Sequence, residues 1–177
     1  WLWRAMFDRV RLPLSWPVYV SQAEASAYAR WRGARLPTEA EFQRAAYGSP
    51  EGERRFPWGN AGPTPSEGVF DFTSWDPEPA GSHPTGSSAW GVEDLAGNGW
   101  EWTATRFAPF PGFRAMASYP EYSSDFFDGQ HFVMKGASPV TARQLIRPTF
   151  RNWFRSRYPY VYATFRCVRS IANRPRT

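Results

Sequence analysis

The sequence predicts an α+β domain with low regular secondary structure, in which two helices and short antiparallel strands are joined by long ordered loops. The composition supports this class, because 18% of the 177 residues are aromatic, with 10 Trp, and the chain also contains 17 Pro and 14 Gly. Large rings can build a core, while Pro and Gly interrupt helices and strands. The length suits one ordinary domain with its own hydrophobic core.

Two capping boxes mark the starts of the helices. Each box places a Glu three residues after a hydroxyl residue, so that the two side chains satisfy free N–H groups of the first helical turn. The four residues are Ser21, Glu24, Thr38 and Glu41. We therefore expect helices over residues 22–32 and 39–47, each ended by a glycine. Helical spacing places Tyr28 and Trp31 on or near the apolar face of the first helix.

Loops and short strands account for the remainder of the chain. Residues 49–91 are rich in Gly, Pro, Ser and Asp but carry aromatic rings throughout, and exposing so many rings to water would be costly. We interpret this stretch as a long ordered loop region packed on the core. Short strands are expected over residues 99–105, 132–136 and 160–169. Residues 143–152 are either another strand or an extended arm.

Charge and composition disfavour several classes of protein. The single Cys excludes an internal disulfide framework, which favours the reducing cytoplasm. No apolar stretch reaches bilayer length, so we expect a soluble protein with no membrane partner. The net charge of +5 comes from basic residues scattered along the chain, and we therefore expect no nucleic-acid partner.

Four motifs stand out along the chain: RLPTEAEFQRAAYG (residues 35–48), WGVEDLAGNGWEWT (90–103), VMKGAS (133–138) and FRNWFRSRYPYVYATFRCVR (150–169). Their order and spacing resemble the family of formylglycine-generating enzymes, or sulfatase-modifying factors. The resemblance extends over nearly the whole chain from Pro17 onward. It implies a modified C-type-lectin-like fold.

Within that superfamily, three further segments look like the sulfoxide synthases of ergothioneine biosynthesis: PFPGF (109–113), SYPEYSSDFFDG (118–129) and TFRNWF (149–154). This resemblance implies O2-dependent formation of a C–S bond between a cysteine-type thiol and the imidazole of N-alpha-trimethylhistidine (hercynine). It also implies iron(II) held by three histidines on a separate N-terminal DinB-like helical domain. Residues 1–16 are then expected to be the end of a preceding segment or linker, and residues 17–177 the formylglycine-generating-enzyme-like domain.

Few residues of the chain are of the types that bind a transition metal. It contains only His83 and His131, in unrelated loops, so we expect no iron ligands in this chain. Formylglycine generation uses a copper-binding pair of cysteines, whereas the chain has only Cys167, which we expect to be a core residue. Asn98 and Glu101 resemble the calcium loop of some superfamily members, although the same motif can be a turn entering a strand.

Asn152 and Trp153 belong to the segment that, by resemblance, faces the active site and contacts the trimethylhistidine. An amide can hydrogen-bond a carboxylate or an imidazole, and aromatic faces attract a quaternary ammonium group. Trp153 has an alternative interpretation as one more ring of the core.

The identity of the thiol depends on the residues that follow. Relatives that use gamma-glutamylcysteine place an acid and an arginine at the positions of Phe154 and Tyr158. Because an unpaired head group is costly in a site, free cysteine is preferred over gamma-glutamylcysteine. Arg155 and Arg157 either hold a carboxylate in a bidentate fork or are solvated surface charges.

A catalytic acid is missing where the resembled enzymes can carry a tyrosine, because this chain has Phe110 there and a phenyl ring cannot donate a proton. The acid is then expected from the N-terminal domain or from Tyr158, Tyr160 or Tyr162. The alternative to an enzyme is a non-catalytic C-type-lectin-fold binding module, since fold alone does not separate the two.

Overall fold

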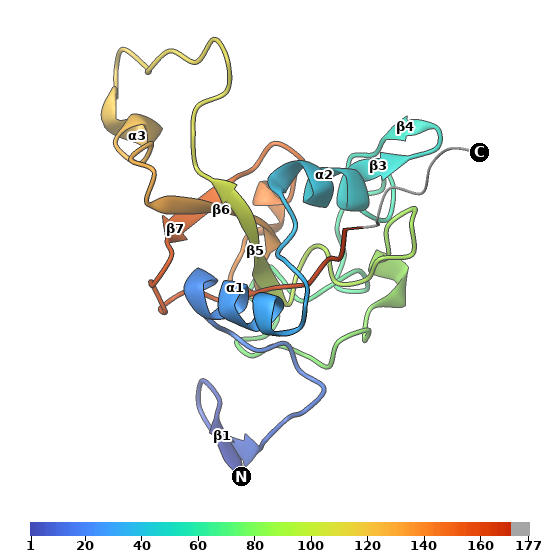
Figure 1. Cartoon of the computed structure of the whole chain (residues 1–177). Coiled ribbons are helices and arrows are strands. Elements are labelled where there is room, and N and C mark those ends of the chain that lie inside the picture. Colours follow the sequence, from blue (N-terminus) through green and yellow to red (C-terminus); the bar gives the residue numbers. More distant parts are fainter. Residues whose placement is uncertain (171–177) are drawn as a thin grey trace, which may run out of the picture.

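The computed structural model describes residues 1–170 and confirms the predicted α+β class (Figure 1). It contains two helices, α1 (Gln22–Trp31) and α2 (Glu39–Tyr47), and a short helical turn, α3 (Glu121–Ser124). The strands are β1 (Leu2–Arg4), β2 (Arg9–Arg11), β3 (Gly48–Ser49), β4 (Gly52–Glu53), β5 (Gly99–Arg106), β6 (His131–Ala137), β7 (Asn152–Arg155) and β8 (Ala163–Thr164). Two 3-10 turns, η1 (Pro84–Gly86) and η2 (Arg143–Leu145), lie in the loops.

A four-stranded sheet in the order β7-β6-β5-β8 forms the centre of the domain. β6 pairs antiparallel with both β5 and β7, so that Val133 lies opposite Trp153 and Met134 opposite Trp102. β8 is instead parallel to β5, which the sequence did not predict. The reason is that residues 156–162 carry the chain from β7 to the opposite edge of the sheet, so β7 and β8 point the same way.

Both capping boxes are present, and the helices begin where the sequence predicts. The Ser21 hydroxyl accepts a hydrogen bond from the Glu24 amide and the Glu24 carboxylate accepts one from the Ser21 amide. The predicted face of α1 is wrong, because Tyr28 and Trp31 are exposed while Ala25 and Ala29 are buried. Alanines allow the helix to lie close to the sheet, where they pack in one cluster with Trp100 and Trp102.

The core is built from aromatic rings, as the composition predicts. Trp102 is fully buried, and its indole N–H donates a 2.8 Å hydrogen bond to the Val20 carbonyl. Two further clusters centre on Phe70 and Phe42. The predicted loop region from residue 49 to 91 is ordered and supplies Phe70 to the core, although its first residues also form the small β3–β4 hairpin.

The chain after β7 differs from the prediction of a long strand over residues 160–169. Only β8 pairs continuously with β5, and one isolated bridge joins Val168 to Arg35. After Thr164 the chain leaves the sheet edge, and Arg166 pairs with Glu101. Cys167 is exposed, so its predicted place in the core is wrong. The preceding arm, residues 143–152, is a 3-10 turn followed by a hydrogen-bonded turn over residues 147–150, and it leads into β7.

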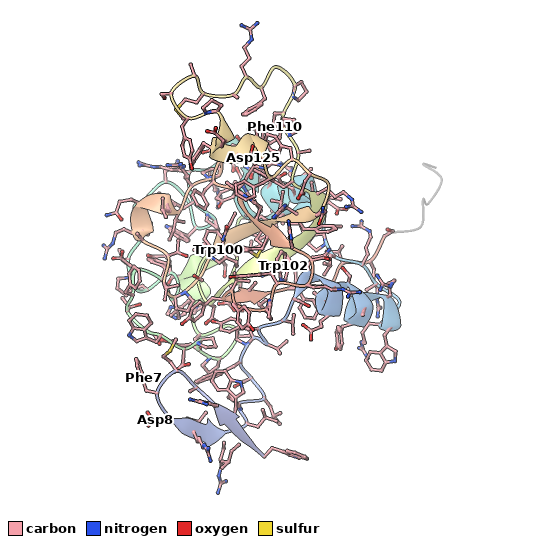
Figure 2. All side chains as sticks on the ribbon, turned by 90° about the vertical axis from the view of Figure 1, so that its left-hand side faces the viewer. Phe7, Asp8, Trp100, Trp102, Phe110 and Asp125 are labelled. Carbon is pink, nitrogen blue, oxygen red and sulfur yellow. The ribbon has the colours of Figure 1, made fainter. Side chains whose placement is uncertain are left out.

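Two parts of the chain extend from opposite ends of the core (Figures 1 and 2). At one end, β1 and β2 form a hairpin whose Met6 amide donates to the Asp76 carboxylate at 3.0 Å. At the other end, the loop between β5 and β6 carries Phe110 and Asp125 (Figure 2). In residues 1–170, no helix has the length and apolar character that crossing a bilayer requires.

Candidate functional site

A cavity of about 530 Å³ lies between the arm that precedes β7 and the loop that follows β5. Asn152 and Trp153 line one side of it, and Phe110 lies across from them in the loop. Its other lining residues are Phe107, Pro109, Pro111, Gly112, Phe113, Tyr122, Ser123, Phe127, Arg147, Thr149, Phe150 and Arg151. The structure therefore brings together three of the residues that the sequence marks for substrate binding.

Stacked rings form much of the cavity wall. The Trp153 ring lies parallel to the Phe107 ring, with centroids 4.2 Å apart and planes 6° apart. Phe127 packs on Phe107 at 4.8 Å, and Phe126 packs on Trp153 at 5.5 Å. Trp153 is thus both a packed ring and a cavity residue, so the two interpretations of its sequence position are compatible. The Arg151 guanidinium already lies over the Phe107 ring, 4.9 Å from its centroid, so an organic cation would have to contact other rings of the lining.

Asn152 has a free donor at the edge of this cavity. Its Oδ1 accepts a 2.9 Å hydrogen bond from the Trp153 amide, which fixes the orientation of the side chain. Its Nδ2 makes no hydrogen bond to any residue in the described part of the chain. The side chain is only half-buried, so this NH2 group is available to an acceptor on a ligand.

Arg151, which sequence reasoning missed, joins the two sides of the cavity. Its Nε and Nη2 donate to the two carboxylate oxygens of Glu39 at 2.7 and 2.9 Å, and its Nη1 donates to the Ala108 carbonyl at 2.9 Å. The guanidinium also lies over the Phe110 ring, 4.4 Å from its centroid. All three nitrogens are engaged, so Arg151 holds the loop against the arm rather than offering a free ligand. The feature of the sequence that could have identified Arg151 is its position immediately before Asn152.

Lys135 holds the same arm by hydrogen bonds to its backbone. It is 2% exposed, and its Nζ donates to the carbonyls of Pro148 and Phe150 at 2.6 and 2.8 Å. Burial lowers the pKa of Lys135 to about 8, with Arg151 acting in the same direction and Glu39 opposing it. Lys135 is the only lysine of the chain. A buried cation thus fixes the residues that lead to Asn152.

The contribution of Lys135 to the free energy of unfolding is expected to rise with pH between about 8, its pKa in the folded chain, and about 10.4, its ordinary pKa. The pKa of Lys135 is lower in the folded chain than its ordinary value, so in this range the unfolded state binds more protons. Below pH 8, Lys135 is protonated in both states, so the folded state carries the full free-energy cost of burying its charge. The limiting slope is about 1.4 kcal/mol per pH unit, and urea unfolding at several pH values measures it.

Lys135→Met is the control, because it removes the titrating group and should flatten that slope. Because the chain has a single lysine, labelling lysine with 13C gives one Cε resonance. Its titration midpoint should lie near pH 8 and not near the ordinary value of about 10.4. A midpoint at the ordinary value would contradict the buried environment of Nζ.

The remaining predicted substrate and acid residues lie outside this cavity. Phe154 packs against the core and stacks on Tyr158 with centroids 4.8 Å apart. Tyr160 is exposed, and Tyr162 packs edge-on against Tyr19 at 5.5 Å. Arg155 and Arg157 line a different cavity near α1. The structure therefore does not bring the three candidate tyrosines to Asn152.

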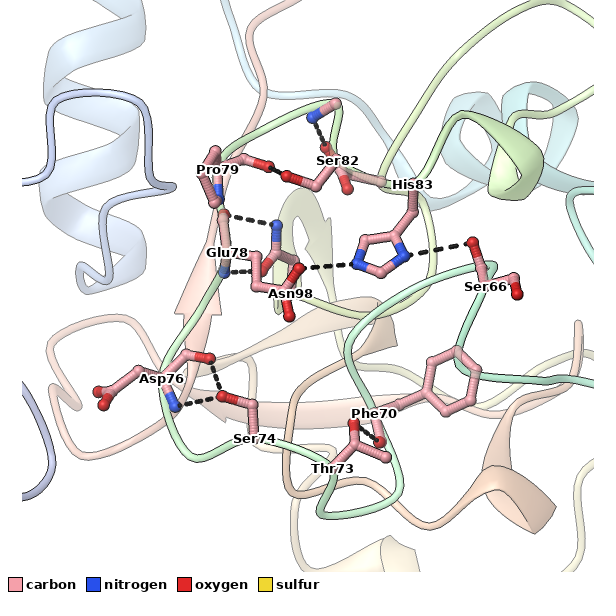
Figure 3. Close-up of polar contacts among 12 residues, drawn as sticks. Ser66, Phe70, Thr73, Ser74, Asp76, Glu78, Pro79, Ser82, His83 and Asn98 are labelled. Atoms are coloured by element: carbon pink, nitrogen blue, oxygen red, sulfur yellow. Dashed lines mark hydrogen bonds and ion pairs between the residues drawn. The ribbon is translucent and has the colours of Figure 1, made fainter.

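The residues considered for calcium are engaged by protein groups. The Asn98 amide exchanges two hydrogen bonds with the backbone of Glu78, at 2.7 and 3.0 Å (Figure 3). Both Glu101 carboxylate oxygens accept hydrogen bonds from Arg166. A calcium ion would have to replace Arg166 at Glu101, so this geometry lends the calcium prediction no support.

The histidines are likewise occupied and lie apart. The His83 ring nitrogens contact the Ser66 carbonyl at 3.2 Å and the Glu78 carboxylate at 3.1 Å (Figure 3). His131 Nδ1 contacts the Asp128 carboxylate at 2.9 Å. Within residues 1–170, no three His, Cys, Asp or Glu side chains are grouped as metal ligands. The described residues therefore do not fit an iron(II) site.

The family follows from comparison with known proteins. The model of the family described as "Sulfatase-modifying factor enzyme 1-like domain" matches residues 8–171. The chain belongs to this family. The resemblance that the motifs indicate is thereby confirmed, and so is the fold of these sulfatase-modifying-factor-like domains. A solved structure, PvdO from Pseudomonas aeruginosa, has the same fold, with a TM-score of 0.59 and 20% identity over 88% of this chain and 62% of its own.

Two curated relatives of this sulfatase-modifying-factor-like domain carry functional names. The chain is 41% identical over 170 residues to "Hercynine oxygenase" of Mycobacterium tuberculosis, which covers 94% of this chain and 39% of that protein. It is 30% identical over 165 residues to "Ergothioneine biosynthesis protein 1" of Schizosaccharomyces pombe, covering 89% of this chain and 19% of that protein. The chain thus spans well under half the length of each of these two relatives.

Proposed function

We propose that this chain is the substrate-binding domain of a non-haem iron(II), O2-dependent sulfoxide synthase that joins a cysteine-type thiol to the imidazole of N-alpha-trimethylhistidine in ergothioneine biosynthesis. The observation that carries the proposal is the aromatic cavity lined by Asn152 and Trp153. The 41% identity to a protein named hercynine oxygenase supports it over almost the whole chain. The setting would be the cytoplasm, in keeping with a single cysteine.

The chemistry of the cavity matches the parts of trimethylhistidine. The aromatic lining, which includes Trp153, Phe113 and Tyr122, would supply ring surface for the quaternary ammonium group, a contact that gains strength where water is excluded. The free Nδ2 of Asn152 donates to the carboxylate or to an imidazole nitrogen. Glu39 neutralises Arg151, so Lys135 supplies the remaining positive charge, which attracts a carboxylate without contacting it.

Iron belongs, in this proposal, to an N-terminal DinB-like helical domain. The loop over residues 107–128 supports a neighbouring domain, because it exposes apolar side chains beside the cavity. They are Phe110, Phe113, Met116, Tyr119, Tyr122 and Phe126. Apolar groups at such density mark a contact surface. Tyr158, Tyr160 and Tyr162 do not line the cavity, whereas Tyr122 does. The catalytic acid would therefore be Tyr122 or a residue of that domain.

Cysteine is the proposed thiol substrate. At the positions where gamma-glutamylcysteine would need an acid and an arginine, Phe154 and Tyr158 stack on each other and offer no charged partner. Arg155 and Arg157 do not line the Asn152 cavity, so a carboxylate-binding role for them in this reaction stays a prediction.

An aerobic assay with iron(II), cysteine and trimethylhistidine tests the proposal, with the sulfoxide detected by mass spectrometry. The chain is assayed alone and joined to its natural upstream region. We expect product only in the joined form. Absence of product in the joined form, despite bound iron, would refute the enzyme reading and favour a non-catalytic lectin-fold module.

A further inference from the structure

A second cavity, of about 680 Å³, lies beside α1 and is lined by four arginines. They come from four separate segments, and they are Arg30 in α1, Arg106 at the end of β5, Arg155 at the end of β7 and Arg157 in the turn that follows. The other lining residues are Gln22, Ala23, Ser26, Gly129, Gln130, Phe132 and Ser156. The lining contains no carboxylate, so its formal charge is strongly positive.

These charges are not neutralised by nearby acids. Within residues 1–170, no carboxylate lies within 4.0 Å of the guanidinium groups of Arg30, Arg155 or Arg157. Asp128, which lies next to the lining in sequence, contacts His131 instead. Gathering like charges in one place costs free energy, and a bound anion would remove that cost.

One of the four positive groups and the backbone beside two others are held in place before any ligand arrives. Arg106 donates to the Gly129 carbonyl and lies 5.2 Å from the centroid of the Phe132 ring. The Ala23 amide donates to the Ser156 carbonyl at 2.9 Å, which ties the turn between Arg155 and Arg157 to the first turn of α1.

We propose that this arginine pocket is a binding site for a small anion with two or more negative charges, of the phosphate class. Guanidinium groups form paired hydrogen bonds with phosphate oxygens, and several arginines on separate elements suit an anion with several oxygens. The pocket shares no lining residue with the Asn152 cavity, so the site is separate. Single-stranded nucleic acid is disfavoured, because the one ring in the lining, Phe132, already packs against Arg106.

Calorimetric titration with pyrophosphate at constant ionic strength tests the site. We expect the double variant Arg155→Gln/Arg157→Gln to bind about ten- to a hundredfold more weakly than the natural chain, as loss of charge-assisted hydrogen bonds implies. The matched control is Arg9→Gln/Arg11→Gln, which removes two exposed arginines of β2 and should leave the affinity unchanged. Arg30→Gln should also weaken binding. Because Arg30 lies in α1, a loss of affinity in this variant cannot come from a local change in β7.

Three results would overturn the proposal. The first is no binding of pyrophosphate to the natural chain, and the second is an equal loss of affinity in the β2 control, which would mean general charge attraction. The third is displacement of pyrophosphate by cysteine, which would assign these arginines to the thiol substrate. The first two results leave the proposed function untouched, and the third would place the thiol substrate at these arginines without altering the role of the Asn152 cavity.

Discussion

Arg166→Leu is expected to destabilise the domain by about 3 kcal/mol or more, because it leaves a buried carboxylate without its partner. Glu101 is 2% exposed in the middle of the sheet, and Arg166 Nε donates to it at 2.6 Å while Nη2 bonds the other carboxylate oxygen. Arg166 Nη2 also donates to the Glu93 carbonyl at 3.0 Å. The change is measured as the free energy of unfolding in urea.

Two further variants separate this effect from a general loss of charge. Arg143→Leu breaks the ion pair with Asp71, which is partly exposed to solvent, and should have a much smaller effect. The double variant Glu101→Leu/Arg166→Leu should recover part of the lost stability, because it removes the orphaned charge as well. A double variant less stable than Arg166→Leu alone would show that the cost lies in packing.

Asn152→Ala is expected to weaken binding of trimethylhistidine about ten- to a hundredfold, if the proposed function holds. The variant removes the one free amide donor at the cavity edge, and a hydrogen bond to a charged group contributes about 1.5–3 kcal/mol. The dissociation constant is measured calorimetrically on the chain joined to its natural upstream region. The thermal midpoint should change little, since the side chain is only half-buried.

Asn60→Ala is a matched control for the Asn152 variant. Each Asn accepts one backbone hydrogen bond through Oδ1, at 2.9 Å from Trp153 for Asn152 and at 3.0 Å from Arg55 for Asn60. Only Asn152 lines the cavity. Equal affinities of the two variants for trimethylhistidine would remove Asn152 from the binding site.

Local features of the structure were predictable because their causes lie within a few residues. Ser21 with Glu24, and Thr38 with Glu41, are close in sequence, so the helix starts follow from the chain itself. The face of α1 was wrong because burial depends on the partner surface, and alanines, not Tyr28, fit against the sheet. The parallel pairing of β8 was missed because it depends on a crossover between distant strands.

Some features of the candidate site were likewise predictable from the sequence, and others were not. The sequence by itself determined the class of fold and the family motifs, and it marked Asn152 and Trp153 as candidate substrate residues, since these are read from neighbouring residues. Only the tertiary structure decided that Glu39, Lys135 and the arm before Asn152 form one support, and that arginines from three distant parts of the chain share a pocket. The physical reason is that ion pairs and shared cavities join residues far apart in the sequence, such as Arg151 and Glu39, which are 112 positions apart. Such contacts exist only after the helices, sheet and loops have packed.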